Sequence, residues 1–506
     1  MDEASRARIR VFLNDPAARG QRAVPSDPPL DTERGPWGFR VEGRRPRPLP
    51  YEPDTPGFLH WQIASALARG RSLWTSLLPK AGKWIPGPVL AAIPIDGDGL
   101  NAFYDRRALH FFRDVDAKSG AIVHSGDSPD IVTHEQGHAV LDAIRPDLWD
   151  APHFEVAAFH EAFGDVAAIL VALEEAELAR AVVDETHGSV DRSNLVSRLA
   201  EELAAAVAAR YGPGAALPDA LRDAVNAFDY RAPRSLPEEA PADALSREPH
   251  SFGRVVTGAC WDVLVRLYVA ESRTPAASEA GESAAALARA ARRLGRLVAA
   301  AAANAPPAAA FFRRFAAELE SAARAEGAAP SEIARALDSR ALLPRAAKRE
   351  PGARGERIAA MGLGGDGMPT RLLDAVREHF GASADEEILV HPAPDGGFRG
   401  RRTRDLVLSG AEYGAADGAA VEISDSFAVT VEETGYVTAS RIERAGPEEE
   451  EDAREFVRSL ARAGRIAEEP APDPESLFRE GKSHFVTKEA DGVRRLRRAW
   501  LSGGRR

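Results

Sequence analysis

Apolar residues recur at a helical spacing over much of the first two thirds of this chain. The helical pattern runs through residues 58–74 and dominates again over 130–343, whereas residues 100–112 have the pattern of strands. Residues 1–55 are rich in Pro and Arg, and apart from a short strand at 8–13 they predict loop or an extended arm. The pattern therefore predicts a small β-containing lobe followed by a helical lobe.

A segment rich in Gly and Pro, residues 346–368, follows the helical region and predicts a linker. It contains a formal G-x-G-x-x-G at Gly362, Gly364 and Gly367. A dinucleotide-binding fingerprint needs a strand before this motif and a helix after it, and the residues before it are weak as a strand. We therefore favour a flexible linker over a nucleotide site.

Composition changes again after the linker. An acidic stretch at 448–455 opens a predicted helix, and residues 484–501 predict a hairpin about Ala490-Asp491-Gly492. Residues 369–506 are thus expected to form a small α+β domain, in which we find no catalytic motif. Its strand-like runs are 387–390, 420–423, 427–431 and 436–439. The predicted division of the whole chain is an N-terminal extended arm at 1–55, a main domain at 56–345, the linker at 346–368 and the C-terminal domain at 369–506.

Composition and charge narrow the function classes. The 506 residues carry a formal net charge of −12 without a basic stripe interleaved with aromatic residues, so we expect no nucleic-acid partner. No run of about 18 apolar residues suggests a membrane span, and no apolar signal segment follows Met1. We therefore expect a cytoplasmic protein without a membrane partner, with export by an unrecognised route as the alternative. The single Cys260 predicts a buried thiol and no internal disulfide.

The strongest motif is an H-E-x-x-H formed by His134, Glu135 and His138. Four residues on a helix bring both imidazoles to one face, one turn apart, where two ring nitrogens can bind one Zn²⁺. Glu135 follows the first ligand and is rotated away from the metal, so it can reach a water on the metal instead. The motif alone also arises by chance, and histidines on an apolar helix are often hydrogen-bonded core residues.

A second predicted helix carries a candidate third ligand, which favours a metal site over hydrogen-bonded core histidines. A catalytic zinc needs a third protein ligand and one open position, and Glu161 lies on a nearly all-apolar helical pattern at 154–175. Such a helix is buried, and a buried carboxylate needs a charged partner. Asp165, one turn later, is suited to hold a ligating imidazole through its other N–H.

With these motifs the chain resembles the thermolysin family of zinc peptidases over roughly residues 50–345. The resemblance rests on four blocks in order, of which the two metal blocks are the specific part. These blocks are Asn101-Ala102-Phe103-Tyr104, the metal helix at 130–142, Glu161-Ala162-Phe163-Gly164-Asp165 and the closing helix at 330–337. The resemblance implies a thermolysin-like zincin core of the α+β class, followed here by the additional C-terminal domain.

The resemblance also implies an activity, zinc-dependent hydrolysis of peptide bonds in a peptide or protein substrate. A zinc-activated water attacks the carbonyl, with Glu135 as general base. Asn101 and Ala102 match the family's strand that lies along bound substrate, and Arg222 resembles its substrate-binding arginine. Calcium is also bound by relatives, and Asp130 fits one ligand; because another matching position is Ala172, we predict no calcium.

The donors to the oxyanion are where the sequence departs from the family. Counting back from Thr257-Gly258 gives Arg254 where relatives have histidine, and the nearest histidine is His250. Either residue is a candidate catalytic donor. The family's tyrosine between the metal helices has no counterpart, and His153 is the nearest polar residue. Each lost donor costs about 10²–10³ in rate.

Two alternatives to the endopeptidase follow from these departures. The first is a catalytically weak or inactive scaffold that zinc stabilises and whose C-terminal domain binds a partner. The second is a peptidase dedicated to its own chain or to one partner, with residues 346–506 delivering or blocking substrate. The sequence alone leaves both open, as it does cleavage preference and oligomeric state.

Overall fold

A computed structural model describes most of the chain. Its described residues are 8–18, 20–79, 81–118, 120–272, 280–343, 374, 377, 382–383, 388–392, 398–431, 437–471 and 474–502. Over these residues the fold is α+β, as the sequence predicts. The predicted linker at 346–368, with its glycine motif, lies outside the described residues.

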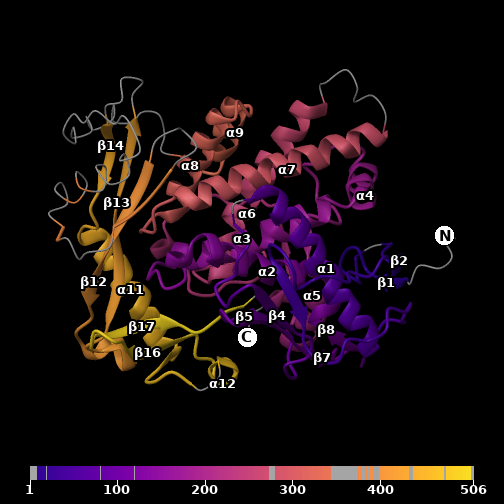
Figure 1. Cartoon of the computed structure of the whole chain (residues 1–506), viewed down its shortest axis with the longest axis horizontal. Helices are drawn as coiled ribbons and strands as arrows, with labels where there is room; N and C mark the ends of the chain where they lie inside the picture. Colours follow the sequence, from indigo (N-terminus) through magenta and orange to yellow (C-terminus); the bar gives the residue numbers. More distant parts are fainter. Residues whose placement is uncertain are drawn as a thin grey trace. The chain divides into compact units, whose positions relative to one another are not determined.

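Contacts group the chain into two compact units (Figure 1). Unit 1 comprises Met1–Pro146, Ala158–Ala299 and Trp500–Arg506, and unit 2 comprises Asp147–Ala157 and Ala300–Ala499. These divisions differ from the predicted boundary near residue 345, because residues 300–343 group with the C-terminal sheet. The predicted domain boundaries therefore stay a prediction.

A five-stranded sheet forms the β part of unit 1, in the order β18-β5-β6-β4-β3. Its strands are β3 (Gly38–Val41), β4 (Val89–Ile93), β5 (Ala102–Tyr104), β6 (Ala108–Phe111) and β18 (Leu501–Ser502). β4 runs parallel to β3 and β6, and β5 is antiparallel to both β6 and β18. The described residues of unit 1 also form three two-stranded ladders: β1 (Ile9–Val11) with β2 (Val24–Ser26), β7 (Arg113–Val115) with β8 (Ile122–His124), and β9 (Arg198–Leu199) with β10 (Arg222–Asp223).

The prediction that the N-terminal arm is loop beyond residue 13 is wrong for β2 and β3. β3 has a mostly buried pattern and takes its hydrogen bonds from β4, about fifty residues later. A run of three or four residues is too short to show a period of two, so pairing with a distant strand decided its structure.

The helices of unit 1 pack around the apolar helix α3 (Phe154–Leu173), whose first four residues group with unit 2. By length and composition alone α3 could cross a membrane, but its apolar window is wholly buried in the fold, so the expectation of no membrane partner stays a prediction. Cys260 is buried, as predicted. The other helices are α1 (Pro56–Leu77), α2 (Pro129–Ile144), α4 (Ala176–Thr186), α5 (Glu201–Tyr211), α6 (Pro249–Ser272) and α7 (Ala280–Asn304), the last of which ends in unit 2.

Unit 2 is built on a seven-stranded sheet with the path β11-β12-β13-β17-β16-β15, and β14 pairs with β13. The two strand-like runs at 420–423 and 427–431 are one continuous strand, β13. β12 was not predicted, because Arg residues replace the apolar alternation that marks a strand. The strands are β11 (Ile388–Pro392), β12 (Phe398–Val407), β13 (Ala420–Val431), β14 (Val437–Glu443), β15 (Ile466–Ala467), β16 (His484–Lys488) and β17 (Arg494–Arg498), and the helices are α8 (Phe311–Ala325), α9 (Pro330–Ser339), α11 (Pro447–Arg462) and α12 (Pro474–Arg479).

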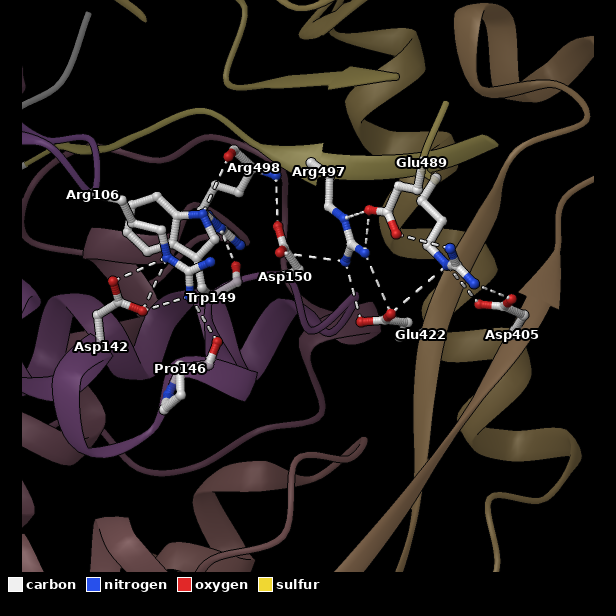
Figure 2. A network of polar contacts seen from close by, with 11 residues as sticks. Arg106, Asp142, Pro146, Trp149, Asp150, Asp405, Glu422, Glu489, Arg497 and Arg498 are labelled. Atoms are coloured by element: carbon white, nitrogen blue, oxygen red, sulfur yellow. Dashed lines mark hydrogen bonds and ion pairs between the residues drawn. The ribbon is translucent and has the colours of Figure 1, made fainter. Parts of the chain in front are cut away.

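Ion pairs hold β17 in unit 2 (Figure 2). Arg497 donates to Glu489 at 2.6 Å and contacts Glu422 at 3.1 Å. The backbone N–H of Arg498 donates to Asp150 at 2.8 Å, and its guanidinium donates to the carbonyl of Trp149 at 2.7 Å. These contacts hold the residues just before β18 within unit 2.

Candidate metal centre

The candidate centre lies where α2 crosses α3 in unit 1. A Cβ at Gly137 would lie 2.8 Å from the Cβ of Ala167 and 3.0 Å from the Cα of Gly164. A Cβ at Gly164 would lie 2.7 Å from the ring of His134. Two glycines facing each other therefore allow the helices to approach closely enough for side chains of both to meet.

His134 and His138 on α2 and Glu161 on α3 converge, and all three are buried. The Nε2 atoms of the two histidines lie 3.4 Å and 3.7 Å from Oε2 of Glu161. Ligands at about 2.0–2.1 Å from Zn²⁺ in a tetrahedron are about 3.3–3.4 Å apart. The three atoms therefore have the spacing of ligands to one metal ion.

The chemistry of the donor set also fits zinc. Within the part of the chain that the structure describes, neither Nε2 has a hydrogen-bond partner, although both atoms are buried. A buried polar atom without a partner carries a free-energy cost. A cation among two imidazoles and a carboxylate would remove this cost, and this is a common donor set of catalytic zinc.

Asp165 orients His134 through the ring nitrogen that faces away from the candidate metal position. The Nδ1–H of His134 donates to Oδ1 of Asp165 at 3.0 Å, which leaves Nε2 pointing toward Glu161. Arg222 contacts the same carboxylate through Nε at 3.0 Å and Nη2 at 2.8 Å. The hydroxyl of Thr257 lies 3.5 Å from its other oxygen. Arg222, predicted to bind substrate, thus neutralises Asp165, and it also lines a small cavity next to His250.

The charges at the centre are strongly coupled. Burial disfavours the charged form of His134, but the neighbouring carboxylates of Asp165 and Glu161 outweigh burial and raise the pKa of His134 to about 9. Burial holds the pKa of His138 well below its usual value, which favours the neutral form in which an imidazole binds metal. Burial alone would raise the pKa of Glu161, but nearby His250 and His138 lower it well below the usual value.

Of the two candidate oxyanion donors, the structure brings His250 to the centre. Its Nε2 lies 3.0 Å from Oε2 of Glu161, and its Nδ1 lies 2.5 Å from Glu248. The two carboxylates outweigh burial and raise the pKa of His250 well above its usual value. The two carboxylates therefore favour the protonated form of His250 next to a candidate metal ligand. Glu248 was missed in the sequence, although an acidic residue two positions before a histidine is a weak signal for such a pair.

Arg254 lines the same small cavity as His250, but its guanidinium is bound to a loop, so its catalytic role stays a prediction. Its guanidinium donates to the carbonyls of Ala242 and Ala244 and to the hydroxyl of Ser251. It also lies over the ring of Phe228, 4.4 Å from the centroid. Arg254 thus ties a loop to the start of α6.

The remaining predicted residues are placed as follows. Glu135 is fully buried on α2 beside His134. Asn101 is buried, and its side chain accepts a hydrogen bond from the N–H of Ala102 in β5. His153 belongs to unit 2, where it pairs with Asp452 at 2.8 Å.

A second group of acidic side chains lies elsewhere in unit 1. Asp15, Asp130 and Glu201 are buried, with carboxylate oxygens within 4.8 Å of one another. Burial and mutual repulsion raise the pKa of Asp130 to about 8 and that of Glu201 to about 9. Carboxylates this close either share protons or hold a cation. Asp15 and Glu201 were not singled out in the sequence, because only the fold brings them to Asp130.

Comparison with known proteins adds no assignment. No protein-family model matches the chain, and a search of curated proteins finds no match. The residues of the site are therefore what indicates the function.

Proposed function

We propose that this chain is a zinc-dependent endopeptidase with a thermolysin-like core. One observation supports this most strongly: His134, His138 and Glu161 converge from two helices at the spacing of metal ligands, with Asp165 behind the first histidine. Structural zinc sites are closed by four protein ligands, whereas catalytic sites have three and an open position. Among the described residues the donor set has three members, which favours catalysis.

Zinc, when bound, lowers the pKa of a coordinated water toward about 7 and polarises a carbonyl oxygen. Glu135 takes the proton of the attacking water and returns it to the leaving amine, so one carboxylate serves as base and then as acid. The imidazolium of His250 is suited to donate a hydrogen bond to the oxygen that gains negative charge. Asp165 keeps His134 in the tautomer that presents Nε2, and Arg222 is the counterion of Asp165.

The direct test replaces the base without touching the ligands. A Glu135→Gln protein is expected to bind one zinc per chain with wild-type affinity and to cleave a peptide library at least about 100-fold more slowly. Glu177→Gln makes the same chemical change on the exposed face of α4 and is the matched control, with unchanged cleavage. Equal cleavage by wild-type and Glu135→Gln proteins, both loaded with zinc, would refute the proposal.

A further inference from the structure

The edge of the strand nearest the metal helix is covered by the chain itself. β18 pairs antiparallel with β5, with Leu501 opposite Tyr104 and Ser502 opposite Phe103. Leu501 is only 3% exposed, and the ring of Trp500 lies 6.3 Å from that of Phe103. The other edge of β5 pairs with β6. β18 thus occupies the one side of β5 that would otherwise be an open edge of this sheet.

β5 is fastened to the helix that carries the metal ligands. The hydroxyl of Tyr104 lies 3.1 Å from Asp142 on α2, and Arg106 donates to the same carboxylate at 2.6 Å (Figure 2). Asp142 comes four residues after His138 and therefore lies on the same side of the helix, one turn away. The edge covered by β18 thus belongs to a strand that packs against the metal helix.

An open strand edge is a general binding surface for extended peptides. Its unpaired N–H and C=O groups accept a further strand whatever the side chains of that strand are. A peptidase must hold its substrate extended across the reacting centre. Among the described strands β5 contacts the metal helix most, so the edge of β5 is the candidate place for that substrate. A chain that places its own strand there has the geometry of a blocked site.

We propose that β18 occupies the peptide-binding edge of the metal centre, so that the resting chain is autoinhibited and its partner is an extended polypeptide that displaces β18. The inference rests on the proposed function only for the reaction that follows displacement. The expected occupant is an extended segment, because a partner must run as a strand to pair with the backbone of β5.

The length of β18 makes displacement feasible. It has two residues, shorter than most strands, so it has few hydrogen bonds to lose to a longer peptide. Only Ala499 and Trp500 separate β18 from β17, which the ion pairs of Arg497 and the hydrogen bonds of Arg498 hold within unit 2. A short tether keeps an inhibitory segment at high local concentration while leaving it replaceable.

The test is to dislodge β18 without altering the centre. Leu501→Asp places a charge at a buried position, and Ser502→Pro independently removes a backbone N–H from the strand. Val407→Asp puts the same charge at a position that is 58% exposed and is the control. Cleavage of an unstructured fluorogenic decapeptide is measured together with hydrogen exchange of residues 102–104 and zinc content.

We expect both strand variants to exchange faster at β5 and to show a KM at least about tenfold lower with kcat unchanged, since the binding-competent fraction rises. Added decapeptide should slow exchange at β5 again in the Glu135→Gln background, where it is not cleaved. Unchanged KM and unchanged peptide binding in variants whose β5 amides exchange faster would overturn the inference while leaving a peptidase intact. If the zinc-loaded strand variants, in which Glu135 is retained, bind the peptide at β5 and yet do not cleave it, that result would support the inference and refute the proposed function.

Discussion

Replacement of Asp165 by Asn is expected to weaken metal binding and the metal-free fold by two separate routes. Asp165 accepts the Nδ1–H of His134 and is the counterion of Arg222, and the side chains of Asp165 and Arg222 are 1% and 9% exposed. Asparagine keeps one oxygen that can accept a hydrogen bond but loses the charge. The first route therefore acts on the metal ligand and the second on a buried ion pair.

The magnitudes of the two routes differ. Loss of the partner that orients a metal-binding histidine lowers metal affinity by about 10–100-fold, or about 1.4–2.7 kcal/mol. Loss of one member of a buried ion pair leaves an uncompensated charge and costs about 3–5 kcal/mol of unfolding free energy. The metal-free protein should thus lose more stability than the metal site loses binding energy.

A double variant separates the routes. Asp165→Asn combined with Arg222→Met removes both charges, so metal-free stability should recover relative to Asp165→Asn alone, while zinc affinity stays low. Arg222→Met alone, which retains the contact with His134, should bind zinc nearly as wild type does. Zinc affinity is measured by competition with a chromophoric chelator, and stability by urea unfolding in excess chelator. Recovery of zinc affinity in the double variant would show that Asp165 acts through the fold and not through His134.

Two further perturbations test the buried carboxylates and the crossing of α2 and α3. Burial raises the folded-state pKa of Asp130 to about 8 and that of Glu201 to about 9, so ionisation of these carboxyl groups opposes folding. In the presence of chelator, the unfolding free energy measured by urea titration should therefore fall as the pH rises from 5 to 9. Asp130→Asn should make this dependence on pH weaker. Gly164→Ala drives a methyl group into the ring of His134 and should cost about 1–3 kcal/mol in urea unfolding together with zinc affinity. Gly281→Ala, with open space around its Cα, should raise stability by up to about 1 kcal/mol, and equal effects of the two alanines would contradict the packing argument.

The metal ligands on α2 were predictable because the relation between them is local. His134 and His138 are separated by one helical turn, so any helix over these residues brings their rings together. Glu161 needed one further step, since its helix had to be buried and had to cross α2. The glycines at 137 and 164 that permit this crossing stand in the sequence, but only their mutual distance shows that they face each other.

The choice between His250 and Arg254 was not accessible from the sequence. The two residues are four positions apart on α6 and lie on the same side of the helix, so the helical pattern cannot show which of them faces the metal centre. The choice is made by distant groups: loop carbonyls at 242 and 244 and the ring of Phe228 capture the guanidinium, while Glu248 and Glu161 hold the imidazole. Loop conformation, which carries no periodic signal, decided this part of the site.

The strands β3 and β18 were missed for a related reason. A strand of two to four residues shows no period, and what makes it a strand is the partner whose backbone groups it satisfies. β18 lies hundreds of residues after β5 and pairs with it through backbone N–H and C=O groups, which nearly every residue type carries. Recognition of this kind has little dependence on side chains, so the sequence of β18 gives little sign of its partner. The same independence is what would allow extended peptides of many sequences to take its place.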